Sequence, residues 1–210
     1  MPLSIQKPLS IPERGFLLCI RIKSIVLFHS NRMEKIQRED YGLSRLFLLT
    51  MVLSFFGWLF ETGYFLIGKG YYSDRGFLTL PFCPIYGCSL IGMYLLIGTP
   101  NERIVKIPFY VAVCFLLPSL MELLIGFIFD KVWNRRLWTY FGYPYNLNGY
   151  ICLRNSILWG VMAFFFMKYL FPPLKKAVGK LSRRRSNVLA VCLSVILWID
   201  FLCNLILLYR

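Results

Sequence analysis

Five long apolar windows constrain this chain more than any other feature of its sequence. Each holds about 18 or more largely apolar residues, which is the length that an α-helix needs to cross the hydrocarbon core of a bilayer. The composition agrees, with 58% hydrophobic residues and a mean hydropathy of +0.60. We therefore predict an all-α fold, a polytopic membrane protein with a bundle of about five transmembrane helices. The windows are Leu46–Ile67, Pro81–Gly98, Pro108–Phe129, Ile151–Phe171 and Val188–Leu208.

The domain organisation follows from the short loops between these windows. None of the loops can form a separate domain, so residues 33–210 are predicted to be one five-helix transmembrane domain. Residues 1–32 differ, because Arg21 and Lys23 interrupt their apolar stretch, and they lack a signal-peptide core and cleavage site. Met33 opens MEKIQREDYGLSRLF, which reads as a start in its own right. We expect residues 1–32 to be a weakly ordered basic extension or a mis-assigned start.

The net charge of +14 lies in the loops rather than on one face of a soluble fold. This placement favours topology determination and attraction to anionic lipid over nucleic-acid binding. The most basic loop, PPLKKAVGKLSRRRSN, follows the fourth window and lies on the same side as the segment before the first. By the positive-inside rule we predict a multi-pass protein of the cell membrane, with a cytoplasmic N-terminus and an extracytoplasmic C-terminus.

Ionisable residues inside the windows are the main candidates for a site. With the predicted orientation, Glu61, Glu122 and Asp200 lie about 10 Å below the outer boundary, at ~1.5 Å rise per residue. Arg154 lies three residues into its window, which begins at the same outer boundary. Helical spacing places Asn204 one turn from Asp200. It also places Glu61 on a face of small and polar residues with Ser54, Gly57, Tyr64 and Gly68, and Glu122 on a face with Ser119 and Gly126.

Two interpretations of these residues compete. In the structural one, Arg154 neutralises a carboxylate and holds the bundle together. In the functional one, Glu61, Glu122, Arg154, Asp200 and Asn204 form a proton, cation or substrate site, because three acids against one base leave a surplus of negative charge. Ionisable residues at this depth usually mark sites, which favours the functional interpretation by a small margin.

The remaining polar and aromatic features carry weaker signals. The seven cysteines lie in or beside the windows; Cys83 and Cys152 fall near outer ends and could meet, but small apolar packing is the safer interpretation. The aromatic residues of DKVWNRRLWTYFGYPYNLNGY are read by default as a belt at headgroup level, with a lid over the acidic layer as the alternative.

Catalytic and nucleotide-binding motifs fail on inspection. GYFLIGK resembles a P-loop, but Gly70 replaces the required Ser or Thr, and the pattern closes a membrane helix instead of following a strand. The single histidine, His29, leaves no zinc-hydrolase motif and no Ser–His or Cys–His pair. We predict that the chain is not an enzyme and has no catalytic residue, metal site or cofactor.

Four segments, SFFGWLFET, RGFLTLPFCPIYG, SLMELLIG and NLNGYICLRNSILWG, together resemble a known family. They are similar to the signature segments of the bacterial family described as putative ABC-transporter type IV membrane proteins, over about Leu46 to Asp200. Positions that fit the family pattern are Glu61, Arg75, Gly76, Pro81, Cys83, Pro84, Tyr86, Gly87, Glu122, Trp138, Tyr140, Asn148, Gly149, Trp159 and Gly160. Departures are Leu80, Thr139 and Tyr150, where Gly, Asp and a basic residue are common. The departure at Thr139 removes a loop carboxylate and counts against ion binding by that loop.

The resemblance implies an integral membrane protein and, through the family name, a transport permease. Three functions follow as hypotheses. The first is the membrane subunit of a transporter, with a separate ATPase subunit, since the chain has no nucleotide site; a homo-oligomer is also expected, because five helices are few for a complete pathway. The second is a non-transporting envelope accessory protein with structural charges. The third, a membrane enzyme acting on a lipid-linked substrate, has the least support.

Overall fold

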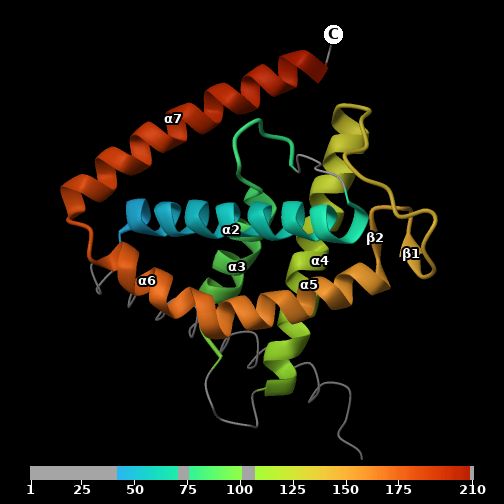
Figure 1. The fold of residues 1–210 in the computed structure, drawn as a ribbon, viewed down its shortest axis with the longest axis horizontal. Coiled ribbons are helices and arrows are strands. Elements are labelled where there is room, and N and C mark those ends of the chain that lie inside the picture. Colours follow the sequence, from blue (N-terminus) through green and yellow to red (C-terminus); the bar gives the residue numbers. More distant parts are fainter. Residues whose placement is uncertain (1–41, 71–75, 101–106, 209–210) are drawn as a thin grey trace, which may run out of the picture. The chain divides into compact units, whose positions relative to one another are not determined.

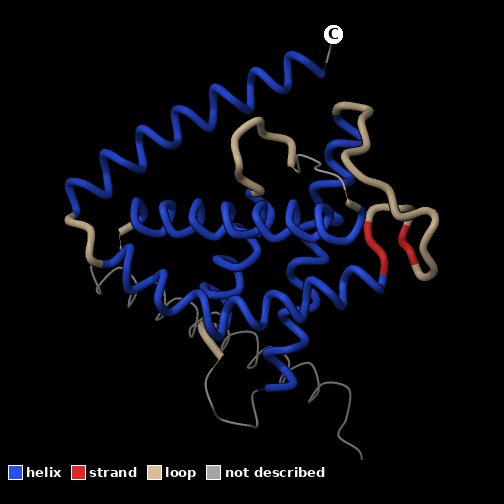
Figure 2. The backbone as a smooth tube through the Cα atoms, viewed as in Figure 1, coloured by secondary structure: helices blue, strands red, loops and turns tan. Residues whose placement is uncertain are grey.

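The computed structural model describes residues 42–70, 76–100 and 107–208. These residues form the helices α2 (Leu43–Lys69), α3 (Pro84–Ile97), α4 (Ile107–Val132), α5 (Leu153–Phe165), α6 (Phe171–Gly179) and α7 (Arg183–Leu208), with a π-helical segment η2 (Phe166–Leu170) between α5 and α6 (Figure 1). The short strands β1 (Asn146–Leu147) and β2 (Ile151–Cys152) form an antiparallel hairpin just before α5 (Figure 2). The prediction of an all-α polytopic fold is confirmed. The predictions for residues 1–32 and for Arg75 fall outside the described residues.

Within the described residues, four helical stretches are long and apolar enough to cross a membrane: α2, α4, the run from α5 to α6, and α7. The second predicted window, Pro81–Gly98, contains only α3, whose 14 residues are apolar but short. At ~1.5 Å per residue this helix spans roughly 20 Å, less than the ~30 Å hydrocarbon core. The predicted helix start at Pro81 is wrong. The backbone of Cys83 is extended, as is usual for the residue before a proline, and Pro84 then begins the helix.

The fourth window differs from its prediction at both ends. Ile151 and Cys152 belong to strand β2, so the helix begins at Leu153, and it continues through η2 and α6 to Gly179. The basic segment predicted as a loop is therefore mostly helical, with a turn only at residues 180–182. Prolines in the first turn of α6 explain this result, because that turn needs fewer backbone donors and the π-helical segment before it absorbs the altered hydrogen bonding.

Small residues set the helix contacts. Helix α2 packs against α3, and α4 packs against α5. A Cβ atom on Gly57 would overlap the Tyr86 side chain, and one on Gly87 would overlap Ser54 and the carbonyl of Thr50. The predicted face of α2 therefore makes close contact with α3 at Ser54 and Gly57, as expected for small residues between membrane helices.

In the described part of the chain, helix α7 packs against fewer elements than the other long helices do. Its main helix contact is with α2 (Figure 1), and most of its apolar side chains are exposed, as expected for a lipid-facing helix. At the turn before it, Arg45 Nη2 of α2 donates a hydrogen bond to the carbonyl oxygen of Leu181 over 2.5 Å. This polar contact joins α2 to the chain just before the start of α7. A separate contact, made by Asp200, holds the far half of α7.

Candidate functional site

Glu61 accepts hydrogen bonds from two residues at the start of α3. The Tyr86 hydroxyl donates to Glu61 Oε2 over 2.9 Å, and the Cys83 thiol lies 3.9 Å from the same oxygen. The absence of a side chain at Gly57 lets the Tyr86 ring approach α2. Trp159 of α5 packs edge-on against that ring, with ring centroids 5.3 Å apart. Three helices therefore hold the phenol that meets Glu61.

Glu122 of α4 is one of the few charged side chains buried in the described part of the protein, with 6% of its surface exposed. Tyr140 donates a hydrogen bond to Glu122 Oε1 over 2.7 Å. The Trp159 side chain also lies close enough to interact with this carboxyl group. However, no donor within the described residues meets Oε2 at hydrogen-bonding geometry. No Lys or Arg in that part of the chain forms an ion pair with Glu122. Among the described residues, Oε2 of this buried carboxyl group therefore has no hydrogen-bond partner at good geometry.

Glu61 and Glu122 belong to one electrostatic environment, and we call them the carboxylate pair. The negative charge of each carboxylate interacts electrostatically with the phenols of both Tyr86 and Tyr140. Tyr140 lies in the loop after α4, where burial, then the Glu122 carboxylate and, more weakly, Glu61 raise the pKa of its phenol above the ordinary value. It therefore remains a hydrogen-bond donor at neutral pH.

Asp200 and Asn204 bind a different part of the chain. Asp200 Oδ2 accepts hydrogen bonds from the backbone N–H groups of Thr79, over 3.0 Å, and Leu80, over 3.3 Å. The Asn204 side-chain amide donates to Asp200 Oδ1 over 3.3 Å and to Thr79 Oγ1 over 3.0 Å. These residues fasten α7 to the segment before α3, which supplies the second attachment of that helix.

Arg154 is placed apart from the acids. Its guanidinium lies over the ring of Tyr143, 5.5 Å from the ring centroid, and makes no ion pair with an acid in the described ranges. Of the four ionisable residues predicted to share a layer, Glu61 and Glu122 thus interact electrostatically with each other. The structure places Asp200 at residues 79–80 and Arg154 beside Tyr143.

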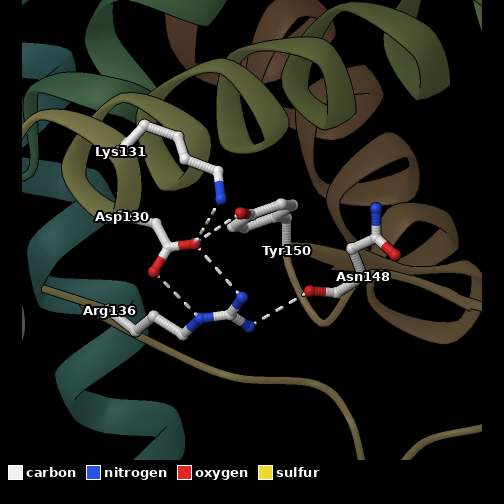
Figure 3. Close-up of polar contacts among 5 residues, drawn as sticks. All are labelled: Asp130, Lys131, Arg136, Asn148 and Tyr150. Carbon is white, nitrogen blue, oxygen red and sulfur yellow. Dashed lines mark hydrogen bonds and ion pairs between the residues drawn. The ribbon is translucent and has the colours of Figure 1, made fainter. Parts of the chain in front are cut away.

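A second polar cluster lies at the end of α4 and was not predicted from the sequence. Arg136 Nε and Nη2 donate to the two oxygens of Asp130 over 3.1 and 3.2 Å, and Tyr150 donates to Asp130 Oδ2 over 2.6 Å (Figure 3). Lys131 lies 4.0 Å from the same oxygen. Arg136 also donates to the carbonyl of Asn148 over 3.1 Å. The only sequence signal was an acid six residues before an arginine, which is too common to single out.

This cluster folds the segment 133–150, which we call the aromatic loop. The guanidinium of Arg136 lies 4.9 Å from the ring centroids of both Phe141 and Tyr150. The indole N–H of Trp138 donates to the carbonyl of Tyr150 over 2.8 Å, and the Tyr140 N–H donates to the carbonyl of Gly149 over 2.9 Å. Through these bonds the loop directs the Tyr140 hydroxyl toward Glu122.

The backbone of the aromatic loop explains two of the family-pattern residues. Asn148 and Gly149 have φ values of 49° and 73°, in the left-handed region that Asn and Gly tolerate best. A Cβ atom at Gly149 would lie 2.9 Å from the Phe141 ring. The contact of Tyr140 with Glu122 is what the lid hypothesis expects, whereas the exposed Phe141 and Tyr145 are typical of an aromatic belt.

The other pattern residues lie in the segment before α3. Gly76 has a φ of 110°, and a Cβ atom there would lie 3.1 Å from Cys83 Sγ. Pro81 precedes the helix and Pro84 begins it. Cys83 and Cys152 are both buried free thiols, so the pairing considered from the sequence does not form.

Replacing Arg136 by glutamine should unfold the aromatic loop. The variant loses the bidentate contact with Asp130 and the stacking on two rings, so limited proteolysis should cut residues 133–150 several-fold faster than in the wild type. Arg135→Gln is the matched control, because that neighbouring exposed side chain has no described partner. Equal cleavage rates for Arg136→Gln and Arg135→Gln would contradict this role for Arg136.

Comparison with known proteins places the chain in a family. The family described as "Putative ABC-transporter type IV" matches residues 48–205, which include the carboxylate pair, the aromatic loop and Asp200. No curated protein and no solved structure matches the chain. The match covers well over half of the sequence, and the helices are of membrane length. The chain therefore belongs to this family, as a multi-pass membrane protein.

Proposed function

We propose that the protein is the membrane subunit of a transporter and that the carboxylate pair binds a proton or a small cation. One observation carries the proposal: Glu122 is 6% exposed, and its Oε2 has no hydrogen-bond donor in the described residues. A structural carboxylate at such a position is normally satisfied at both oxygens. A buried carboxylate oxygen that meets no donor among the described residues is available to a transiently bound proton, or as one ligand of a cation.

The surroundings of the pair support this proposal. Burying an ionised carboxylate costs several kcal/mol unless an opposite charge or hydrogen bonds compensate it. Two carboxyl groups acting on the same phenols repel each other when both are ionised. A proton or cation taken up between them relieves both costs, whereas Tyr86 and Tyr140 supply only hydrogen bonds. The pair is therefore suited to exchange a positive charge.

The remaining parts of the proposal concern assembly and orientation. Driving transport through ATP requires a separate ATPase subunit, which mild-detergent affinity purification should retain. A homo-oligomer would supply additional helices for a pathway. The basic residues around the α6–α7 turn support a cytoplasmic position for that turn and an extracytoplasmic position for the aromatic loop. The proposal assigns no catalytic step to the chain.

Infrared difference spectroscopy of the protein in liposomes tests ion binding directly. On acidification, or on exchange of Na⁺ against K⁺ or a bulky organic cation, the carboxyl bands should change. Glu122→Gln should remove most of that change, and Glu61→Gln should alter it. Asp200→Asn is the matched control, because Asp200 accepts its hydrogen bonds from loop backbone and lies outside the pair. Identical difference spectra for wild type and Glu122→Gln would refute the proposed site.

The alternative is a non-transporting accessory protein in which the buried charges are structural. Asp200 and Asp130 favour it, since both are fully engaged by groups of the same chain. It predicts that Glu122→Ala lowers thermal stability in detergent while Glu122→Gln is tolerated in every assay. The transporter proposal predicts instead that Glu122→Gln loses substrate uptake although the protein remains folded.

A further inference from the structure

A groove of about 440 Å³ lies between α4, the β1–β2 hairpin and the start of α5. It is separate from the carboxylate pair, whose residues do not line it. Its walls are mainly apolar, with Leu116 and Leu120 on α4, Leu147 on β1, and Ile151 and Leu153 on the other side. This volume is within the range of small-molecule sites in proteins.

The groove is open toward the surroundings of the helices. Leu116, Leu120 and Leu147 are 53%, 55% and 51% exposed. Leu116 and Leu120 are four residues apart, so they lie on successive turns and their wall runs along the helix axis. Because α4 and the α5–α6 run are long and apolar enough to cross a membrane, we expect lipid rather than water to reach a groove between them. Its shape and chemistry suit an extended apolar chain.

A cation neighbours the lining residues at the hairpin end of this groove, although its own side chain is not part of the lining. Arg154 directly follows Leu153, a lining residue, at the first turn of the membrane-length helix. Its guanidinium lies over Tyr143, and the carbonyl of Tyr143 accepts a hydrogen bond from Asn146, another lining residue, over 2.7 Å. Arg154 is exposed and forms no ion pair with a described acid. An arginine at such a position is suited to bind phosphate oxygens through several N–H donors.

We propose that this groove is a binding site for one phospholipid of the adjacent leaflet. One acyl chain occupies the apolar groove along α4, and the phosphate group meets the Arg154 guanidinium beside Tyr143. Charge complementarity selects this occupant, because an apolar groove next to an arginine that pairs with no described acid matches the order of groups in a phospholipid. A purely hydrocarbon ligand has no group that binds the Arg154 guanidinium, and a soluble phosphate compound has no acyl chain to fill the groove.

Native mass spectrometry of the whole chain in detergent tests this site. Dioleoyl-phosphatidylglycerol is the probe, and dioleoylglycerol, which lacks the phosphate, is the comparison ligand. The wild type should hold one tight phosphatidylglycerol and bind dioleoylglycerol about tenfold more weakly, the expected effect of losing a charge-assisted contact. Arg154→Gln should bind both lipids equally weakly. Arg135→Gln, which changes an exposed arginine of the aromatic loop, should behave as the wild type.

A second pair of variants tests the groove itself. Leu120→Trp fills the α4 wall and should abolish the tight adduct, whereas Leu124→Trp, one turn along the helix and outside the lining, should not. Leu147→Trp fills the groove from the hairpin and provides the same test if Leu120→Trp fails to fold. The proposal is overturned if both filled variants bind like the wild type, if the controls weaken equally, or if the tight species is a protein dimer without lipid.

Discussion

Replacing Gly87 by alanine should destabilise the protein by about 2–3 kcal/mol, the cost of overpacking a tight helix contact. A Cβ atom at position 87 would overlap both the Ser54 hydroxyl and the backbone carbonyl of Thr50. The Ser54 hydroxyl donates to that same carbonyl over 2.8 Å, so neither atom has room to move. The α2 and α3 helices must therefore separate.

The separation should also reach the site. Tyr86 precedes Gly87 and donates to Glu61 across the same helix contact, so moving α3 away lengthens this hydrogen bond. Thermal unfolding in a mild detergent measures the stability loss. Gly63→Ala is the matched control on α2, because a Cβ atom there meets nothing within 4 Å. Comparable melting temperatures for Gly87→Ala and Gly63→Ala would show that the contact is looser than the structure indicates.

A double variant separates the two overlaps at Gly87. Ser54→Ala removes the hydroxyl but leaves the Thr50 carbonyl in place, so Gly87→Ala combined with Ser54→Ala should recover part of the lost stability. Residues in contact are expected to show such coupling, typically 0.5–3 kcal/mol. Strict additivity of the two single effects would assign the whole cost to the Thr50 carbonyl.

Replacing Asp200 by leucine should release α7 from the segment before α3. The carboxylate accepts the backbone N–H groups of Thr79 and Leu80, and a leucine leaves both donors unsatisfied. Hydrogen bonds to charged groups contribute about 1.5–3 kcal/mol, and partial exposure places this one near the lower limit. Local opening of residues 76–83 should therefore become about tenfold more frequent.

Hydrogen exchange followed by mass spectrometry measures that change on peptides covering Thr79 and Leu80. Asp200→Asn retains one acceptor oxygen and should give an intermediate effect. Ser194→Leu changes another polar residue of α7, whose hydroxyl donates only to Val191 of the same helix, and should leave exchange at residues 76–83 unaltered. Wild-type exchange in Asp200→Leu would mean that α2 alone holds α7.

Sequence reasoning and structure agree where the bilayer imposes the outcome. Windows of apolar residues predicted the helices because a backbone in lipid must satisfy its own hydrogen bonds. Helical spacing also predicted that Ser54 and Gly57 share a face with Glu61, and the first two contact α3. The predictions failed at the start of α3 and in the α6 segment, which contain prolines, and at Ile151 and Cys152, which form β2. Hydropathy does not report backbone geometry at such boundaries.

The identity of the polar partners lay beyond the sequence. Depth alone grouped Arg154 and Asp200 with the glutamates, but depth does not specify where around the bundle a side chain lies. Asp200 meets a backbone 121 residues away, and Tyr140 reaches Glu122 through a loop folded by Asp130 and Arg136. Such pairings depend on helix order and loop conformation, which no local pattern encodes.

The sequence by itself determined that this protein is a multi-pass helical membrane protein with acids within its helices, because the cost of exposing polar backbone to lipid leaves few alternatives. Tertiary structure alone decided that Tyr86 donates to Glu61 and Tyr140 donates to Glu122, while Asp200 fastens α7 to the segment before α3. The physical reason is that hydrogen bonds act over about 3 Å, and only the folded chain fixes positions to that precision.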